Sequence, residues 1–155
     1  MKFVVISDTH KILDKAIETI KKEKPDFCIH LGDVVQDCED LERLFPNQKF
    51  IFVKGNNDFW TKNASFPDER IFTLDGKKFF ICHGHTYHVK QGLYALLKKA
   101  KDENADIVLY GHTHQSYLEQ DDITVMNPGS YGKYGVITIE NEKVTASIEN
   151  LLNIK

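Results

Sequence analysis

The chain has 155 residues, of which 41% are hydrophobic and 28% charged, a composition that excludes disordered and fibrous proteins. A chain of this length can bury roughly 70% of the surface that its unfolded form exposes, so we expect a single domain spanning residues 1–155. The formal net charge of −3 argues against an extended surface for nucleic acid.

Strands and helices alternate in the first half of the chain. Residues 2–7 are typical of a fully buried strand, and a helix is predicted directly after it. Further strands are predicted at 27–31 and 50–53, with a short helix at 41–45 between them. This β-α-β-α-β order favours a parallel sheet with helices packed on it. The first helix is indicated by apolar residues at helical spacing, namely Ile12, Leu13, Ala16, Ile17 and Ile20.

A hairpin signal interrupts this pattern in the middle of the chain. Asp75 and Gly76 tolerate the positive φ angles of a tight turn, and apolar segments flank them on both sides. A hairpin between parallel-type units suggests a second sheet. The longest helix is predicted at 91–104, followed by an apolar strand at 107–110.

Antiparallel strands are predicted in the tail, residues 116–155, with turns at Asp121-Asp122 and Asn141-Glu142. Terminal strands of this kind can pair with a second copy at a sheet edge, so a homodimer is an open alternative. The apolar run at the start of the chain is ended by Asp8 and is too short for a signal peptide or a membrane span. We therefore expect a cytoplasmic protein without membrane contact.

Side chains that can bind metals follow five of the predicted strands. In open α/β sheets, ligand sites assemble at the carboxyl ends of the strands, because the sheet fixes the side chains and the loops leave space above it. Two pairs are spaced i and i+2, so their side chains point the same way in extended chain. The seven candidate metal ligands are Asp8, His10, Asp33, Asn56, His83, His112 and His114.

The number and chemistry of these groups indicate a dinuclear centre. Seven protein ligands are more than one metal ion binds, because water molecules fill part of its coordination sphere. Two ions that share one carboxylate therefore fit better. Imidazole, carboxylate and amide oxygen together suit Mn²⁺, Fe, Ni²⁺ or Zn²⁺, with manganese the leading prediction. Cys28, Cys38 and Cys82 lack the spacing of a zinc ribbon or a disulfide framework, and we interpret them as reduced packing residues.

The candidate ligands belong to five motifs that follow one another along the chain. They are Asp8-Thr9-His10, Gly32-Asp33, Gly55-Asn56-Asn57-Asp58, His83 and Gly111-His112-Thr113-His114. This order of D-x-H, G-D, G-N-x-D, H and G-H-x-H resembles the pattern of the calcineurin-like metallophosphoesterases, and especially of their small stand-alone phosphodiesterase branch. Asn127-Pro128-Gly129-Ser130 is similar to the loop that small members place near the site.

The resemblance implies an α/β fold built as a four-layer α/β/β/α sandwich of two mixed sheets flanked by helices. It implies hydrolysis of phosphodiesters by in-line attack of a metal-bridging hydroxide, a hydrolase mechanism that needs no covalent protein intermediate. By this resemblance the first ion is held by Asp8, His10 and His114, the second by Asn56, His83 and His112, and Asp33 bridges the two.

The resemblance also suggests which residues contact the substrate. Many relatives carry a histidine at the position of Asn57 and use it with an aspartate like Asp58 to protonate the leaving oxygen. Asn57 cannot act as an acid, which makes His85 the other candidate for that role. The predicted catalytic residues are Asn57, Asp58 and His85, and the predicted substrate-binding residues are Asn57, His85 and Ser130.

Two alternatives remain beside a phosphodiesterase of a small phosphodiester or nucleotide-like substrate. One relative of this fold works as a trafficking scaffold, but loss of ligand histidines would favour a scaffold and all seven ligands are present here. A nuclease for polymeric substrate is the other alternative. Larger nuclease relatives carry a capping domain and a basic surface, whereas this chain is short and slightly acidic.

Overall fold

The computed structural model describes residues 1–9, 13–33, 35–58 and 66–151 and contains two five-stranded sheets. The first sheet has the strand order β10-β9-β1-β2-β3 and the second the order β4-β5-β6-β8-β7. The strands of the first sheet are β1 (Lys2–Ile6), β2 (Phe27–His30), β3 (Lys49–Phe52), β9 (Lys133–Glu140) and β10 (Lys143–Asn150). Those of the second are β4 (Glu69–Leu74), β5 (Lys77–Cys82), β6 (Ile107–Leu109), β7 (Tyr117–Gln120) and β8 (Thr124–Asn127).

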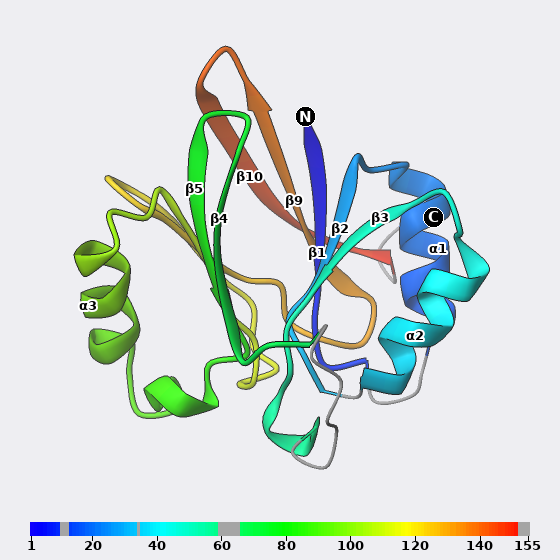
Figure 1. Cartoon of the computed structure of the whole chain (residues 1–155), viewed down its shortest axis with the longest axis horizontal. Helices are drawn as coiled ribbons and strands as arrows, with labels where there is room; N and C mark the ends of the chain where they lie inside the picture. The colour runs from blue at the N-terminus through cyan, green and yellow to red at the C-terminus, as the bar shows by residue number, and fades with distance from the viewer. Residues whose placement is uncertain (10–12, 34, 59–65, 152–155) are drawn as a thin grey trace.

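The sheets face each other and carry helices on their outer faces (Figure 1). The helices α1 (Asp14–Glu23) and α2 (Val35–Leu44) lie on the outer face of the first sheet. The helix α3 (Tyr94–Asp102) covers the outer face of the second sheet. Both sheets are mixed. In the first sheet the parallel pairs β1–β2 and β2–β3 lie at one edge and the antiparallel pairs of β9 and β10 at the other. In the second sheet the parallel pairs of β5, β6 and β8 are flanked by antiparallel pairs on both sides. The predicted four-layer α/β/β/α sandwich is confirmed.

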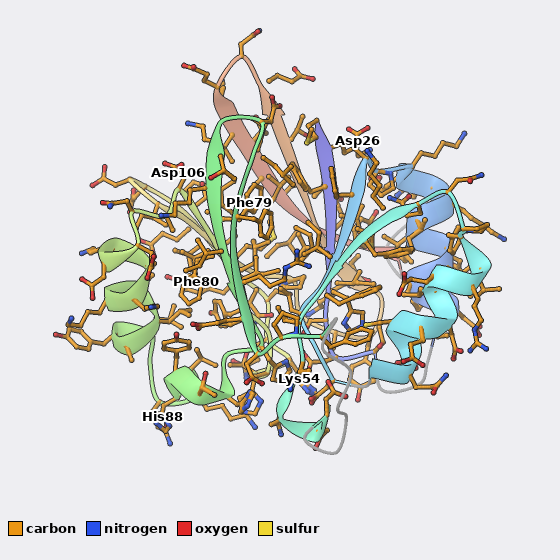
Figure 2. The ribbon with its side chains drawn as sticks, viewed as in Figure 1. Asp26, Lys54, Phe79, Phe80, His88 and Asp106 are labelled. Atoms are coloured by element: carbon orange, nitrogen blue, oxygen red, sulfur yellow. The ribbon has the colours of Figure 1, made fainter. Side chains whose placement is uncertain are left out.

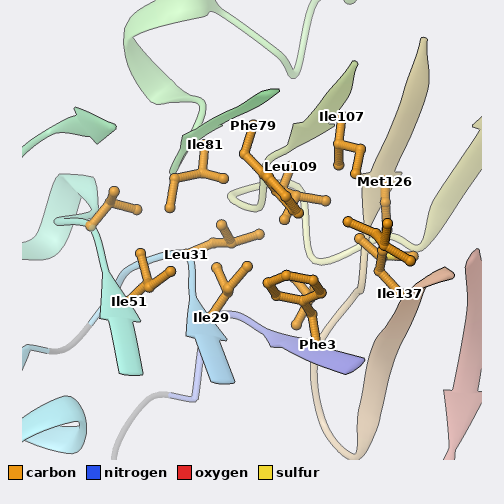
Figure 3. Packing of buried hydrophobic residues seen from close by; sticks show 13 residues of the cluster. Phe3, Ile29, Leu31, Ile51, Phe79, Ile81, Ile107, Leu109, Met126 and Ile137 are labelled. Carbon is orange, nitrogen blue, oxygen red and sulfur yellow. The ribbon is translucent and has the colours of Figure 1, made fainter. Parts of the chain in front are cut away.

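The largest apolar cluster lies between the two sheets (Figure 3). Phe3, Ile29 and Leu31 of the first sheet contribute to it, and they meet Phe79 and Leu109 of the second; all five are fully buried. Side chains alternate across each sheet, so neighbouring residues serve different layers. Phe79 belongs to this central cluster, whereas Phe80 packs in the cluster beneath α3 (Figure 2).

The carboxyl ends of the parallel strands from both sheets lie at one rim of the molecule. β1, β2 and β3 run parallel, and so do β5, β6 and β8. Figure 2 shows Lys54, just after β3, at the lower rim, and Asp26 and Asp106, just before β2 and β6, at the upper one. The candidate ligands among the described residues follow these strands and therefore share the lower rim.

Several elements differ from the sequence-based expectation. The predicted helix at 41–45 is the end of α2, which begins at Val35; its first turns are rich in charged residues that hide the apolar spacing. The predicted helix at 91–104 begins only at Tyr94, because Gly92 has a φ of +136° that no helix accepts. The two tail hairpins form as predicted but join different sheets, β7–β8 in the second and β9–β10 in the first.

Within the described ranges, no helix combines the length and the apolar character needed to cross a bilayer.

We expect the core between the sheets to contribute most of the stability of the fold. Replacing one buried and one exposed leucine with alanine tests this. Leu109 is fully buried between the sheets, whereas Leu44 is 56% exposed at the end of α2. Leu109→Ala should lower the free energy of unfolding by about 3 kcal/mol, and Leu44→Ala by less than about 1 kcal/mol. Urea denaturation measures both. Equal losses for the two variants would contradict this assignment of the core.

Candidate metal centre

Two buried carboxylates and one buried imidazole converge where the two sheets meet at the lower rim. They belong to Asp8 after β1, Asp33 after β2 and His83 after β5, which are 1%, 2% and 0% exposed. One ligand atom from each lies within 4.8 Å of the others. The Nε2 atom of His83 is 3.7 Å from Oδ1 of Asp8 and 3.6 Å from Oδ2 of Asp33.

Asp8 is held in place by donors from both sheets. The hydroxyl of Ser7 donates to Oδ2 of Asp8 over 2.5 Å, and the backbone N–H of His112 donates to the same oxygen over 3.2 Å. The backbone N–H of Asp8 donates to the carbonyl of Gly32 over 3.1 Å. These contacts fix the direction of the carboxylate and leave Oδ1 facing His83 and His114.

Asp33 is oriented by the loop after β3. The backbone N–H of Asn57 donates to Oδ1 of Asp33 over 3.0 Å, and its side-chain amide donates to Oδ2 over 2.8 Å. Asp58 is fully buried, and its Oδ2 accepts hydrogen bonds from the backbone N–H groups of Asp33 and Gly55 over 3.1 and 2.8 Å. Asp58 therefore ties this loop to the end of β2.

The orientation of His83 leaves one ring nitrogen available as a ligand. Its Nδ1 lies 2.8 Å from the carbonyl oxygen of Leu31 and donates to it, which places the lone pair of the neutral ring on Nε2. Nδ1 of His112 lies 3.3 Å from that same Nε2. Burial, together with the neighbouring His83, lowers the pKa of His112 to about 4, so this ring is neutral at physiological pH.

The remaining predicted ligands differ in how close they come to the carboxylates. Nε2 of His114 lies 3.3 Å from Oδ1 of Asp8. Asn56 is exposed on the short helix η1 (Asn56–Asp58), and within the described ranges it has no hydrogen bond to this cluster. Its neighbour Asn57 contacts Asp33 instead. His10 lies outside the described residues.

His85, but not Ser130, contacts the histidine rings of the cluster among the described residues. The ring of His85 lies 5.6 Å from that of His83 and 6.1 Å from that of His112, centroid to centroid. Burial, followed by the proximity of His83, lowers the pKa of His85. Its Nδ1 is buried and has no hydrogen-bond partner among the described residues. Ser130 is buried in the connection between β8 and β9.

Sequence reasoning missed a partly buried chain of hydrogen bonds next to Asp8. Asp37 on α2 accepts a bond of 2.5 Å from the hydroxyl of Thr9, whose oxygen lies 3.0 Å from Nε2 of His30. Nδ1 of His30 accepts from the backbone N–H of Gly32 over 3.1 Å. Thr9 stands inside the D-x-H motif, but the sequence carries no signal for its partner, since Asp37 looks like one more acid on a polar helix. The chain ties α2 and β2 to the loop after β1.

The backbone at the centre adopts conformations that non-glycine residues rarely accept. Asp8, Asp33, His112 and His114 have φ angles of 56°, 55°, 71° and 60°. Residues held in this left-handed region cost of order 1 kcal/mol or more each and cluster at functional sites. Gly111 allows the close approach of the strands, because a Cβ atom there would lie 2.1 Å from Oγ of Ser7 and 2.9 Å from Oδ2 of Asp8.

The donor set fits divalent transition metals. Two buried carboxylates within 4.8 Å of one imidazole place like charges together, which is unfavourable in a low-dielectric site without a cation. Carboxylate oxygen mixed with imidazole nitrogen suits Mn²⁺, Fe, Ni²⁺ or Zn²⁺. Asp8, Asp33 and His83 can therefore hold a metal ion, with His112 and His114 adjacent to them.

The chain is similar in sequence and in structure to known phosphoesterases. Residues 1–147 match the model of the calcineurin-like phosphoesterase superfamily domain. The chain is 36% identical over 163 residues to a phosphodiesterase of Methanocaldococcus jannaschii, with 90% of each protein covered. It is 32% identical over 158 residues to a probable metallophosphoesterase of Bacillus subtilis, covering 94% of this chain and 88% of that protein. A solved structure described as a novel archaeal phosphodiesterase superimposes with a TM-score of 0.74 at 29% identity, covering 96% of this chain and all of the other (100%).

We expect His30 to make the stability of the metal-free protein depend on pH. Burial lowers its pKa from 6.5 to about 4, so between these values the unfolded chain binds a proton that the native ring does not. Stability should therefore fall as the pH drops through this window, by about 1 kcal/mol per pH unit from His30. His30→Gln should show a shallower slope in urea denaturation between pH 6.5 and pH 4.

The exposed His88 provides the control for this experiment, since His88→Gln should keep the slope of the wild-type protein. A His30→Gln slope equal to that of wild type would refute the role of His30.

Proposed function

This chain belongs to the calcineurin-like phosphoesterase superfamily, in its small stand-alone phosphodiesterase branch, and from that premise we propose that it hydrolyses small phosphodiesters with two divalent metal ions, manganese first among them. One observation carries the proposal: the buried group of Asp8, Asp33 and His83. Carboxylates buried this close together are typical of a metal centre and uncommon in a purely structural role.

The candidate ligands divide into two sets, one for each metal ion, with Asp33 between them. Asp33 would bridge the ions, since Asn57 holds its carboxylate beside His83. Asp8, His10 and His114 would hold one ion, supported by the contact of 3.3 Å between His114 and Asp8. His83, His112 and an amide of the Asn56-Asn57 pair would hold the other.

Metal ions bound there would supply two things, polarisation of the phosphoryl oxygens and a nucleophile made from water at neutral pH for in-line attack on phosphorus. The protein contributes rigid placement of the ligands. Asp8 and Asp33 each accept hydrogen bonds from backbone N–H groups, which keeps their carboxylates in one orientation. Preorganisation of this kind removes the cost of rearranging dipoles during the reaction.

The residues around the centre are poor general acids for protonating the leaving group. Asn57 has no acidic proton, and Asp58 is occupied with the backbone of Asp33 and Gly55. The lowered pKa of His85 favours its neutral form, which suits a hydrogen bond to the substrate better than proton donation at neutral pH. We therefore propose substrates whose leaving alcohol is acidic, with His85 and Ser130 contacting the substrate.

The substrate class can be tested with metal-free protein to which Mn²⁺, Ni²⁺, Zn²⁺ or Mg²⁺ is added. Bis(p-nitrophenyl) phosphate should be turned over in the presence of Mn²⁺, and p-nitrophenyl phosphate at least about tenfold less well. Alkyl monoesters should be poorer still, because a missing general acid costs roughly 100-fold or more for a poor leaving group. Comparable turnover of diester and monoester would contradict the proposal, and no turnover with any metal would favour a scaffold.

The role of Asp33 can be tested separately from catalysis by metal binding. Asp33→Asn removes the charge of the proposed bridge and should weaken Mn²⁺ binding by at least about tenfold in calorimetric titration. Asp26→Asn is the control, because Asp26 is exposed at the opposite rim. If Asp33→Asn bound Mn²⁺ as tightly as Asp26→Asn, the proposed centre would be wrong.

A further inference from the structure

A small cavity lies beside the metal centre, between α1 and the connection from β8 to β9. Its volume is about 40 Å³, room for about three water molecules or one small oxyanion. The residues that line it come from the end of β1, from α1 and from the loop before β9. Those that carry polar groups are Ser7, Thr9, Lys15, Thr19, Tyr131 and Lys133.

The cavity shares its walls with the proposed centre. Ser7 donates a hydrogen bond to Oδ2 of Asp8, so one residue lines the cavity and supports a candidate ligand. On the other side, the ring of Tyr131 lies 6.4 Å from that of His114, centroid to centroid, in an edge-to-face arrangement. The cavity is therefore adjacent to Asp8 and His114, separated from them by Ser7 and Tyr131.

The charges around the cavity favour an anion. Lys15 and Lys133 are the charged residues among its described lining. Lys15 is partly neutralised by Glu18 at 3.8 Å, whereas Lys133 has no acidic partner within 4 Å among the described residues. The hydroxyls of Ser7, Thr9 and Thr19 already donate to protein oxygens. The charged donors that remain for a ligand are therefore the two ammonium groups.

The loop that presents Lys133 has an unusual backbone. Gly129, Tyr131 and Gly132 have φ angles of +82°, +54° and +91°. A Cβ atom on Gly129 would lie 2.5 Å from Oγ of Ser116 and 3.2 Å from Cδ of Lys133, so the glycine makes room for both side chains. Tyr131 adopts this conformation although it is 63% exposed, and residues in sparsely populated backbone regions cluster at active sites and ligand clamps as well as in tight turns.

We propose that this cavity binds a second phosphate of the substrate, so that the preferred substrate is a phosphodiester carrying a further phosphate group. This inference rests on the proposed function, because the first phosphate is the one placed at the metal centre. Lys133 supplies the main charge, Lys15 adds to it, and Tyr131 forms the wall between the two phosphates. The cavity thus selects phosphorylated, nucleotide-like diesters over simple aryl diesters.

The test uses two esters that differ by one phosphate, the p-nitrophenyl ester of thymidine 5′-phosphate with and without a 3′-phosphate. In the presence of Mn²⁺, the 3′-phosphate should raise kcat/KM about fivefold or more, mainly through a lower KM. Equal kcat/KM values for the two esters would overturn the proposal. Inhibition by inorganic phosphate would not rescue it, because inhibition alone would show only a site for free phosphate.

Variants of Lys133 test whether this lysine causes the preference. Lys133→Ala should bring the ratio of the two kcat/KM values close to one, and Lys133→Arg should retain most of it, since the charge is kept. Lys143→Ala, at an exposed position at the start of β10, should leave the ratio unchanged. A ratio that survives Lys133→Ala would overturn the assignment.

Binding to the metal-free protein provides a readout without catalysis. Thymidine 3′,5′-bisphosphate should bind about tenfold more weakly to Lys133→Ala than to wild type in calorimetric titration, and equal affinities would refute the subsite. Hydrolysis of both esters without preference would refute the subsite alone. Binding through Lys133 without hydrolysis of either ester would refute the phosphodiesterase proposal and support an anion-binding cavity.

Discussion

The structure depends on a single electrostatic constraint, the burial of two carboxylates side by side. Asp8 and Asp33 follow neighbouring parallel strands, and each has an oxygen within 4.8 Å of the other and of a His83 nitrogen. Hydrogen bonds from Ser7 and Asn57 satisfy part of their acceptor capacity but do not remove the like charges. Burying such charges without a counter-ion costs several kcal/mol, and a divalent cation is the simplest compensation.

The two-sheet fold makes this arrangement rigid by closing the rim from both sides. His83, from the second sheet, donates to the carbonyl of Leu31 in the first, and the backbone of His112 donates to Asp8 across the same boundary. Movement of one sheet against the other would break both contacts. The left-handed φ angles at the strand ends turn the chain sharply there, so that side chains from both sheets reach one point.

Much of the fold and of the candidate site could be predicted from the sequence, because strand patterns and metal-binding residues are local features. The ordered motifs indicated the family and the fold, and the turn residues located the hairpins. Contacts between distant segments could not be predicted, such as the bond from Asp37 to Thr9 or the assignment of the two tail hairpins to different sheets. The structure also brings Asn57, and not Asn56, against Asp33, a choice that depends on the turn of η1.

The dinuclear centre can be tested by locating metal in a crystal of the protein soaked with Mn²⁺. Two anomalous difference peaks are expected about 3.5 to 4 Å apart, one on each side of Asp33. Asp8 and His114 should contact one peak, and His83 and His112 the other. Peaks elsewhere on the surface, with none between Asp8, Asp33 and His83, would contradict the dinuclear centre.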